Sequence, residues 1–173
     1  RFAAVASACI CLPASAGAVQ ARAFLDGVDL VYVGGGHTVR LVTHWRSSGL
    51  DALLGAALRR GVLMAGVSAG ASAWFERFLT DSVGQGLQTA SGIGLMPGSC
   101  CPHYSTEPLR PPAFTAAIGR GDLPPGLAID DGAAVLLGPQ DSPTVFSARP
   151  GARAYRVERD GDGVRSVALP SAR

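Results

Sequence analysis

Residues 62–70 read VLMAGVSAG, an apolar run that ends in a serine between two glycines. An apolar run without polar alternation is typical of a strand in a parallel sheet that helices cover on both faces. Residues 66–70 also match Gly-x-Ser-x-Gly, a strand-to-helix turn that lifts a serine hydroxyl clear of the sheet. The stretch predicts an α/β fold and makes Ser68 a candidate nucleophile.

A glycine loop precedes this stretch. The apolar run Val28–Val33 predicts a strand that stops at Gly34-Gly35-Gly36. The amides of Gly35 and Gly36, together with that of Ala69 after the serine, are candidate donors to an oxyanion. A phosphate site is disfavoured because the chain contains neither G-x-x-x-x-G-K-[ST] nor G-x-G-x-x-G, the two glycine-rich patterns that bind phosphate, and because it has no lysine.

The rest of the chain alternates between helical and extended patterns. Turn and capping residues divide it into segments, and no linker separates it into two domains, so one domain over residues 1–173 is expected. Helices are expected at 21–25, from Thr38 to a stop at Gly49, and at 51–60, 69–78 and 112–120. Further strands are expected at 92–96, 127–131, 133–137, 144–147, 154–157 and 164–169.

A serine hydroxyl needs a general base, and three histidines are available. His103 is the best candidate because it follows Pro102 in a constrained loop, whereas His44 falls on an expected helix and His37 beside the glycines. Asp81, in the loop after the nucleophile helix, is the preferred acid to orient the base. Glu76, on that helix, is the alternative acid.

The amino-acid composition argues against a membrane-spanning, nucleic-acid-binding or metal-binding protein. Apolar residues make up 47% of the chain and charged residues 16%, and no apolar run is long enough to span a bilayer. The net charge is only +2 and the arginines do not cluster in a basic stretch, so neither nucleic acid nor a membrane is an expected partner. The cysteines, at 9, 11, 100 and 101, lack metal-site spacing. Reduced thiols, no metal and a cytoplasmic location are expected.

Two other segments allow alternative interpretations. Residues 1–17 have a basic start and an apolar stretch, Phe2–Leu12, which fits a secretory signal superficially and a buried strand equally well. Asp130-Asp131-Gly132 is interpreted as a turn rather than a metal-binding carboxylate pair, because neighbouring residues of a strand point to opposite faces.

Several of these motifs together resemble peptidase family S51, which includes dipeptidase E (aspartyl dipeptidase) and, more distantly, cyanophycinase. The resemblance is strongest over residues 28–157 and far more specific than Gly-x-Ser-x-Gly alone. In chain order it rests on VYVGGGHT (31–38), AGVSAGA (65–71), WFE (74–76), TDS (80–82), GLMPGS (94–99), CPHY (101–104), AIDDGA (128–133) and RPGARAY (149–155).

The resemblance implies a three-layer α/β/α sandwich with a mostly parallel sheet, similar to class I glutamine amidotransferases. It implies a serine peptidase that hydrolyses short peptides without a cofactor, as a monomer or a homodimer. Ser68 would be the nucleophile, His103 the base and Asp81 the acid, with Glu76 in reserve. The segment before Val28 lacks the family's opening strand, which indicates an N-terminal truncation. The alternative is a degenerate, non-catalytic binding domain of the same fold.

Overall fold

The computed structural model describes residues 17–138 and 143–172 of the chain. The expectations for residues 1–16, including the apolar stretch Phe2–Leu12, lie outside the described residues. The helices are α1 Ala18–Asp26, α2 Thr38–Ser48, α3 Leu50–Arg59, α4 Ala69–Ser72 and α5 Arg110–Arg120. The strands are β1 Leu30–Val33, β2 Leu63–Gly66, β3 Phe75–Thr80, β4 Gln88–Ser91, β5 Met96–Pro102, β6 Gly126–Ile129, β7 Ala133–Leu136, β8 Thr144–Ser147, β9 Ala154–Asp160 and β10 Gly163–Ala168.

The strands form one large sheet and two small ones. The large sheet has the order β10-β9-β6-β5-β3-β4, in which β3, β5 and β6 run parallel and the outer strands are antiparallel. Strands β1 and β2 form a separate parallel pair, and β7 and β8 an antiparallel one. Parallel strands thus lie at the centre of the large sheet; of these, the sequence predicts β6, whereas β3 and most of β5 were not predicted.

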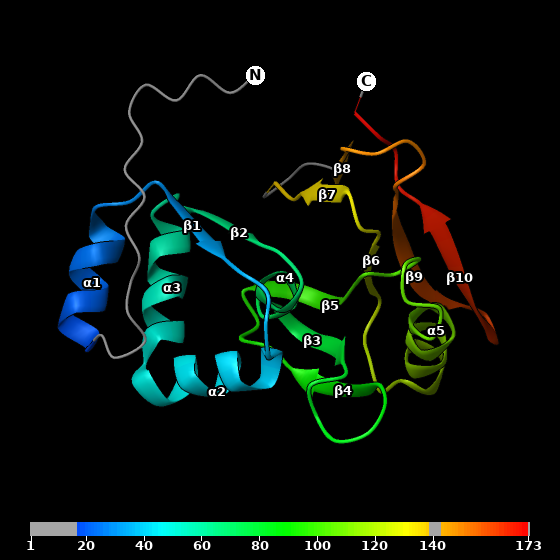
Figure 1. The fold of residues 1–173 in the computed structure, drawn as a ribbon, viewed down its shortest axis with the longest axis horizontal. Coiled ribbons are helices and arrows are strands. Elements are labelled where there is room, and N and C mark those ends of the chain that lie inside the picture. The colour runs from blue at the N-terminus through cyan, green and yellow to red at the C-terminus, as the bar shows by residue number, and fades with distance from the viewer. Residues whose placement is uncertain (1–16, 139–142, 173) are drawn as a thin grey trace.

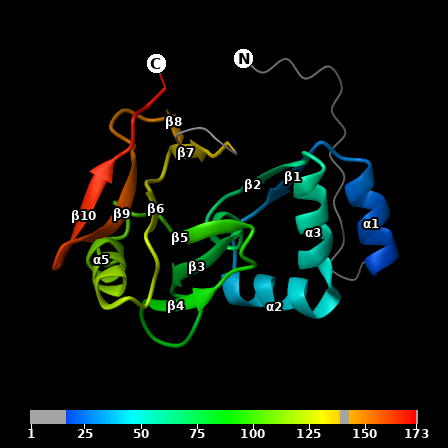
Figure 2. The same ribbon diagram turned by 180° about the vertical axis from the view of Figure 1, so that it is seen from behind.

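Helices cover these sheets and close the core. Helices α1, α2 and α3 pack together beside β1 and β2, whereas α5 packs against β9 and β10 (Figures 1 and 2). Helices α1, α2 and α3 and the strands beside them enclose a core around Trp45, Trp74 and Phe78, in which the centroids of the two indole rings lie 5.1 Å apart. The second core surrounds Phe114 under α5. The short helix α4 contacts β1, β2, β3 and β5 and thereby joins the β1–β2 pair to the large sheet.

The segment after the candidate nucleophile differs from the prediction. The helix expected over residues 69–78 ends at Ser72, and the chain becomes strand β3 from Phe75. Tertiary packing overrides local propensity here, because β3 pairs in parallel with β5 and buries Phe78 completely. The strand expected at 92–96 is also wrong. Residues 92–95 form the connection between β4, which ends at Ser91, and β5, which begins at Met96.

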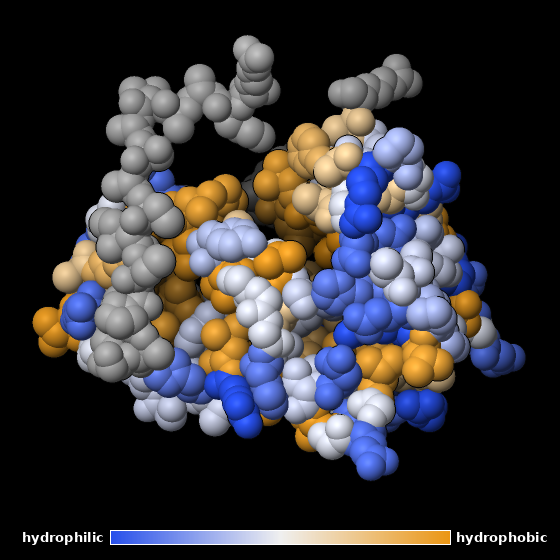
Figure 3. All heavy atoms as spheres, in the orientation of Figure 1, coloured by the Kyte–Doolittle hydropathy of each residue, from blue (hydrophilic) through white to orange (hydrophobic). Residues whose placement is uncertain are grey.

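One face of the β1–β2 pair exposes apolar side chains. Leu30 and Leu63 are register partners that point to the same side, and each is about half exposed. Tyr32, two residues further along β1, lies on this face and is 64% exposed. Figure 3 shows hydrophobic residues in orange at the upper part of the molecule, where Figure 1 draws β1, β2 and β7.

Candidate active site

Ser68 stands at the predicted turn between β2 and α4. Its backbone has φ 54° and ψ −116°, a strained conformation for a residue other than glycine. The flanking glycines allow the close packing around it. A Cβ atom at Gly66 would lie 2.4 Å from the carbonyl carbon of Gly70, and one at Gly70 would lie 2.2 Å from the carbonyl oxygen of Val33. Both glycines of the pattern Gly-x-Ser-x-Gly are therefore required sterically.

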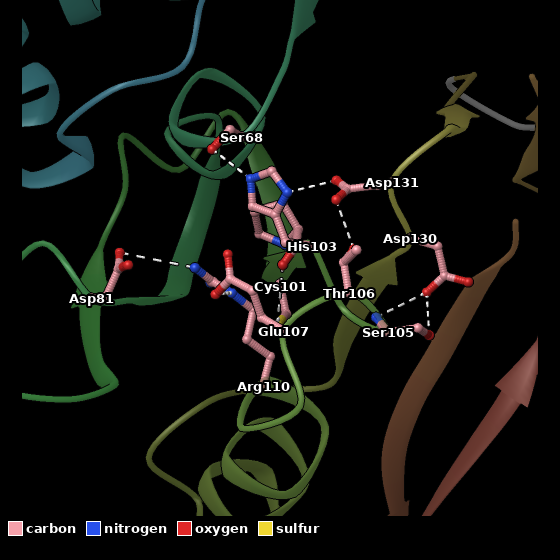
Figure 4. A network of polar contacts seen from close by, with 11 residues as sticks. Ser68, Asp81, Cys101, His103, Ser105, Thr106, Glu107, Arg110, Asp130 and Asp131 are labelled. Carbon is pink, nitrogen blue, oxygen red and sulfur yellow. Dashed lines mark hydrogen bonds and ion pairs between the residues drawn. The ribbon is translucent and has the colours of Figure 1, made fainter.

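His103 is the histidine that the structure brings to Ser68. It follows β5 directly, with φ 57°, and its Nε2 atom lies 2.8 Å from Oγ of Ser68 (Figure 4). Its side chain is 27% exposed, so most of the imidazole is enclosed by protein and part of it remains accessible to solvent. The predicted pairing of Ser68 with His103 is present.

The carboxylate beside His103 belongs to Asp131, which the sequence analysis assigned to a turn. Oδ1 of Asp131 lies 2.6 Å from Nδ1 of His103. The two residues come together because β5 and β6 are parallel neighbours, with Pro102 and Ile129 in register, and His103 and Asp131 follow these strand ends. The turn itself is confirmed, with Gly132 at φ 84°.

The surroundings of Asp131 keep its carboxyl group ionised. The hydroxyl of Thr106 donates a hydrogen bond to Oδ2 at 2.7 Å, and this bond is the largest cause that holds the pKa of Asp131 below its ordinary value. The contact with His103 and the nearby Arg149 guanidinium lower this pKa further. An ionised carboxylate accepts hydrogen bonds, so Nδ1 of His103 is the donor. Nε2 is then free to accept the proton of the Ser68 hydroxyl.

The structure corrects the predicted acid, Asp81. This residue follows β3, which lies on the other side of β5 from β6, and its side chain is 68% exposed. Its carboxylate points to the buried guanidinium of Arg110, with Nη2 and Oδ1 3.9 Å apart, and not to His103 (Figure 4). The attraction of a buried cation explains why Asp81 turns toward α5.

The alternative acid, Glu76, is not beside His103 either. It lies exposed on β3 and not on the predicted helix. Its Oε2 atom accepts a hydrogen bond of 2.9 Å from the backbone N–H of Gly98. Glu76 therefore bridges the start of β3 to β5.

The glycine loop lies against the nucleophile, as the oxyanion prediction requires. A Cβ atom at Gly35 would lie 3.3 Å from Cβ and 3.7 Å from Oγ of Ser68. Within the described residues, the N–H groups of Gly35, Gly36 and Ala69 have no backbone acceptor. Donors left free beside a nucleophile are what an oxyanion hole requires. The assignment of these three residues as oxyanion donors stays a prediction.

The other two histidines lie elsewhere. His37 caps helix α2, where its Nδ1 accepts a hydrogen bond of 3.2 Å from the backbone N–H of Arg40. This role makes His37 the N-cap of the helix. His44 lies on α2, as expected, and is exposed.

The adjacent aspartates Asp130 and Asp131 face different partners. Asp130 accepts hydrogen bonds from the backbone N–H groups of Ser105 and Arg153 and from the Ser105 hydroxyl. Asp131 faces His103 instead. No cluster of three or more metal-binding side chains occurs in residues 17–138 and 143–172. Within the same residues, no helix is long and apolar enough to cross a membrane.

An α/β fold with a serine on a strand-to-helix elbow, hydrogen-bonded to a histidine and through it to an aspartate, defines a serine-hydrolase type of site. The family model of peptidase family S51 matches residues 12–142. The chain therefore belongs to peptidase family S51.

Known proteins give the same family context. The chain is 43% identical over 148 residues to the uncharacterized peptidase YgaJ of Bacillus subtilis, and the match covers 85% of this chain and 64% of the relative. The fold is similar to that of a peptidase from an acI-B1 Actinobacterium, with a TM-score of 0.68, 17% identity and coverage of 91% of this chain and 63% of that one. A putative peptidase E protein from Listeria monocytogenes is also similar, with a TM-score of 0.52, 18% identity and coverage of 91% and 68%.

These comparisons confirm the predicted family and the α/β fold of the peptidase E type. The chain spans somewhat less than two thirds of the length of the Bacillus relative and of the actinobacterial peptidase.

Proposed function

We propose that the protein is a serine peptidase that hydrolyses short peptides, with Ser68 as the nucleophile, His103 as the general base and Asp131 as the orienting acid. The observation that carries the proposal is the continuous series of contacts from Asp131 through His103 to Ser68, 2.6 and 2.8 Å long. Membership of a peptidase family supports the reaction class.

The reaction would follow from these contacts. His103 accepts the hydroxyl proton through Nε2 as Ser68 Oγ attacks the carbonyl carbon of the scissile peptide bond. The N–H groups of Gly35, Gly36 and Ala69 donate to the oxyanion of the tetrahedral intermediate. His103 then gives the proton to the leaving amine, and water releases the acyl group from Ser68 by the reverse sequence. Asp131 stabilises the imidazolium throughout.

The substrate and setting belong to the same proposal. Dipeptides with an N-terminal aspartate are the first substrates to test, because the family resemblance points to dipeptidase E. A cytoplasmic location and catalysis without a cofactor are proposed as well. Cys100 and Cys101 are free and fully buried, which is compatible with a reducing compartment.

Labelling of the serine tests the function without knowledge of the substrate. A fluorophosphonate should modify Ser68 in the folded protein, as found by mass spectrometry of the labelled peptide. Ser68→Ala should abolish labelling and dipeptide hydrolysis, whereas Ser91→Ala, a change at an exposed serine on β4, should alter neither. A folded wild-type protein that is not labelled would contradict the peptidase proposal and favour a non-catalytic binding domain.

A further inference from the structure

Two neighbouring hydroxyl residues after His103 contact two neighbouring aspartates after β6. Ser105 donates to Oδ1 of Asp130 through its backbone N–H, at 3.2 Å, and through its hydroxyl, at 2.5 Å. Thr106 donates through Oγ1 to Oδ2 of Asp131, at 2.7 Å (Figure 4). The two contacts look alike, but Asp131 alone of these aspartates contacts His103 among the described residues. They should therefore have different consequences for the site.

The contact with Thr106 fixes the plane of the Asp131 carboxylate. Oδ1 of Asp131 faces Nδ1 of His103, and Oδ2 accepts the Thr106 hydroxyl, so each oxygen has its own partner. The last torsion of an aspartate side chain has a broad energy profile, and a carboxylate with one partner can turn about it. The Asp131 side chain is also 34% exposed, which lets water compete for an oxygen without a protein donor.

We propose that Thr106 is a positioning residue for the reaction, which fixes the Asp131 carboxylate so that His103 keeps its proton on Nδ1 and presents Nε2 to Ser68. This inference rests on the proposed function. Thr106 acts through Asp131 and is not itself a catalytic residue. Ser105, by contrast, anchors the same loop through Asp130, which is buried and accepts a third hydrogen bond from the Arg153 N–H.

The first test compares three variants by the rate at which a fluorophosphonate labels Ser68. Thr106→Val keeps the side-chain shape but removes the donor, and it should slow labelling about tenfold, roughly the worth of one hydrogen bond to a charged group. Thr106→Ser restores the donor and should restore most of the rate. Ser105→Ala, the matched control, should lower stability while the folded protein keeps its labelling rate. Equal rates for Thr106→Val and wild type would overturn the proposal.

The second test asks whether Thr106 acts through Asp131. In an Asp131→Ala background the threonine hydroxyl has lost its acceptor, so adding Thr106→Val should cause no further loss of labelling rate. Independent, multiplying losses would show that Thr106 acts by another route and would overturn the proposal.

A third measurement separates this inference from the proposed function. The 15N chemical shifts of the His103 ring report which nitrogen carries the proton, whether or not the protein is a peptidase. Thr106→Val should reduce the population with the proton on Nδ1, and Ser105→Ala should not. If wild-type Ser68 is not labelled, the peptidase proposal fails, and the ring shifts alone then decide the positioning role. Unchanged shifts in Thr106→Val would overturn that role.

Discussion

Nδ1 of His103 and Oδ1 of Asp131 lie 2.6 Å apart, although 28 residues separate them in the chain. The contact exists because their strands, β5 and β6, are parallel neighbours whose carboxyl ends meet at one edge of the sheet. Asp81 follows β3, the neighbour on the other side of β5. The order β6-β5-β3 thus places an aspartate on each side of the histidine, and the hydrogen bond distinguishes them.

Asp131→Asn should slow labelling of Ser68 by about 10²- to 10⁴-fold, because an amide that donates to Nδ1 favours the wrong tautomer of His103. The matched variant Asp81→Asn removes a charge that faces Arg110 and should change the rate by less than about threefold. The ratio of the two labelling rates measures the difference directly. A loss at Asp81 as large as that at Asp131 would return the role of acid to Asp81.

The stability that depends on Asp131 should disappear in acid. The pKa of Asp131 is lower in the folded protein than its ordinary value, because of Thr106 first and then His103 and Arg149. A group with a lowered folded pKa contributes stability above its unfolded pKa and loses it as the pH falls through the folded value. Denaturant unfolding of wild type and Asp131→Asn should therefore give free energies that differ at neutral pH, begin to approach each other below about pH 4, and converge only below the lowered folded pKa of Asp131. A difference that grows in acid would contradict this sign.

Gly35→Ala should impair the site without unfolding the protein. The added Cβ would lie 3.3 Å from Cβ of Ser68, which forces the loop or the nucleophile to move. Labelling should slow more than about tenfold, as expected when an oxyanion donor is displaced. Gly34→Ala is the control, since its Cβ would meet nothing within 4 Å, and it should label like wild type. Equal labelling of the two variants would rule out close contact between Gly35 and Ser68.

Gly70→Ala should destabilise the fold itself. Its Cβ would lie 2.2 Å from the carbonyl oxygen of Val33, so α4 would have to move away from β1. Overpacking against backbone costs about 1–3 kcal/mol or more in the free energy of unfolding. Gly27→Ala, whose nearest neighbour would be an ordinary contact at 3.8 Å, should stay within about 0.5 kcal/mol of wild type in thermal or urea unfolding. A Gly70→Ala protein as stable as Gly27→Ala would contradict the packing at the elbow.

The contact between Ser68 and His103 could be predicted from the sequence because both positions depend on local patterns. Ser68 follows an apolar strand within a glycine-flanked turn, and His103 follows Pro102. Asp131 was missed because its role depends on which strands are neighbours, which no local pattern encodes. A signal was nevertheless present, since Asp131 comes soon after the apolar run 127–129, just as His103 comes at a strand end.

The fold was predicted least well after Ser68. The stretch Phe75-Glu76-Arg77-Phe78 places its aromatic residues three apart, which fits a helix as readily as it fits a strand end. Pairing of β3 with both β4 and β5 decided the outcome, and this pairing joins residues distant in sequence. By contrast, helices with clear stops, such as α2 before Gly49, agree with prediction to within a residue.

The contact between Ser68 and His103 connects two separate sheets. Ser68 comes from the β1–β2 pair, whereas His103 and Asp131 come from the large sheet, and the two sheets share no strand pairing in the part of the chain that the structure describes. An inhibitor bound across the serine and the histidine would fasten the sheets to each other. Binding of such an inhibitor should therefore slow amide hydrogen exchange along β1 and β2, away from the site itself, and raise the melting temperature.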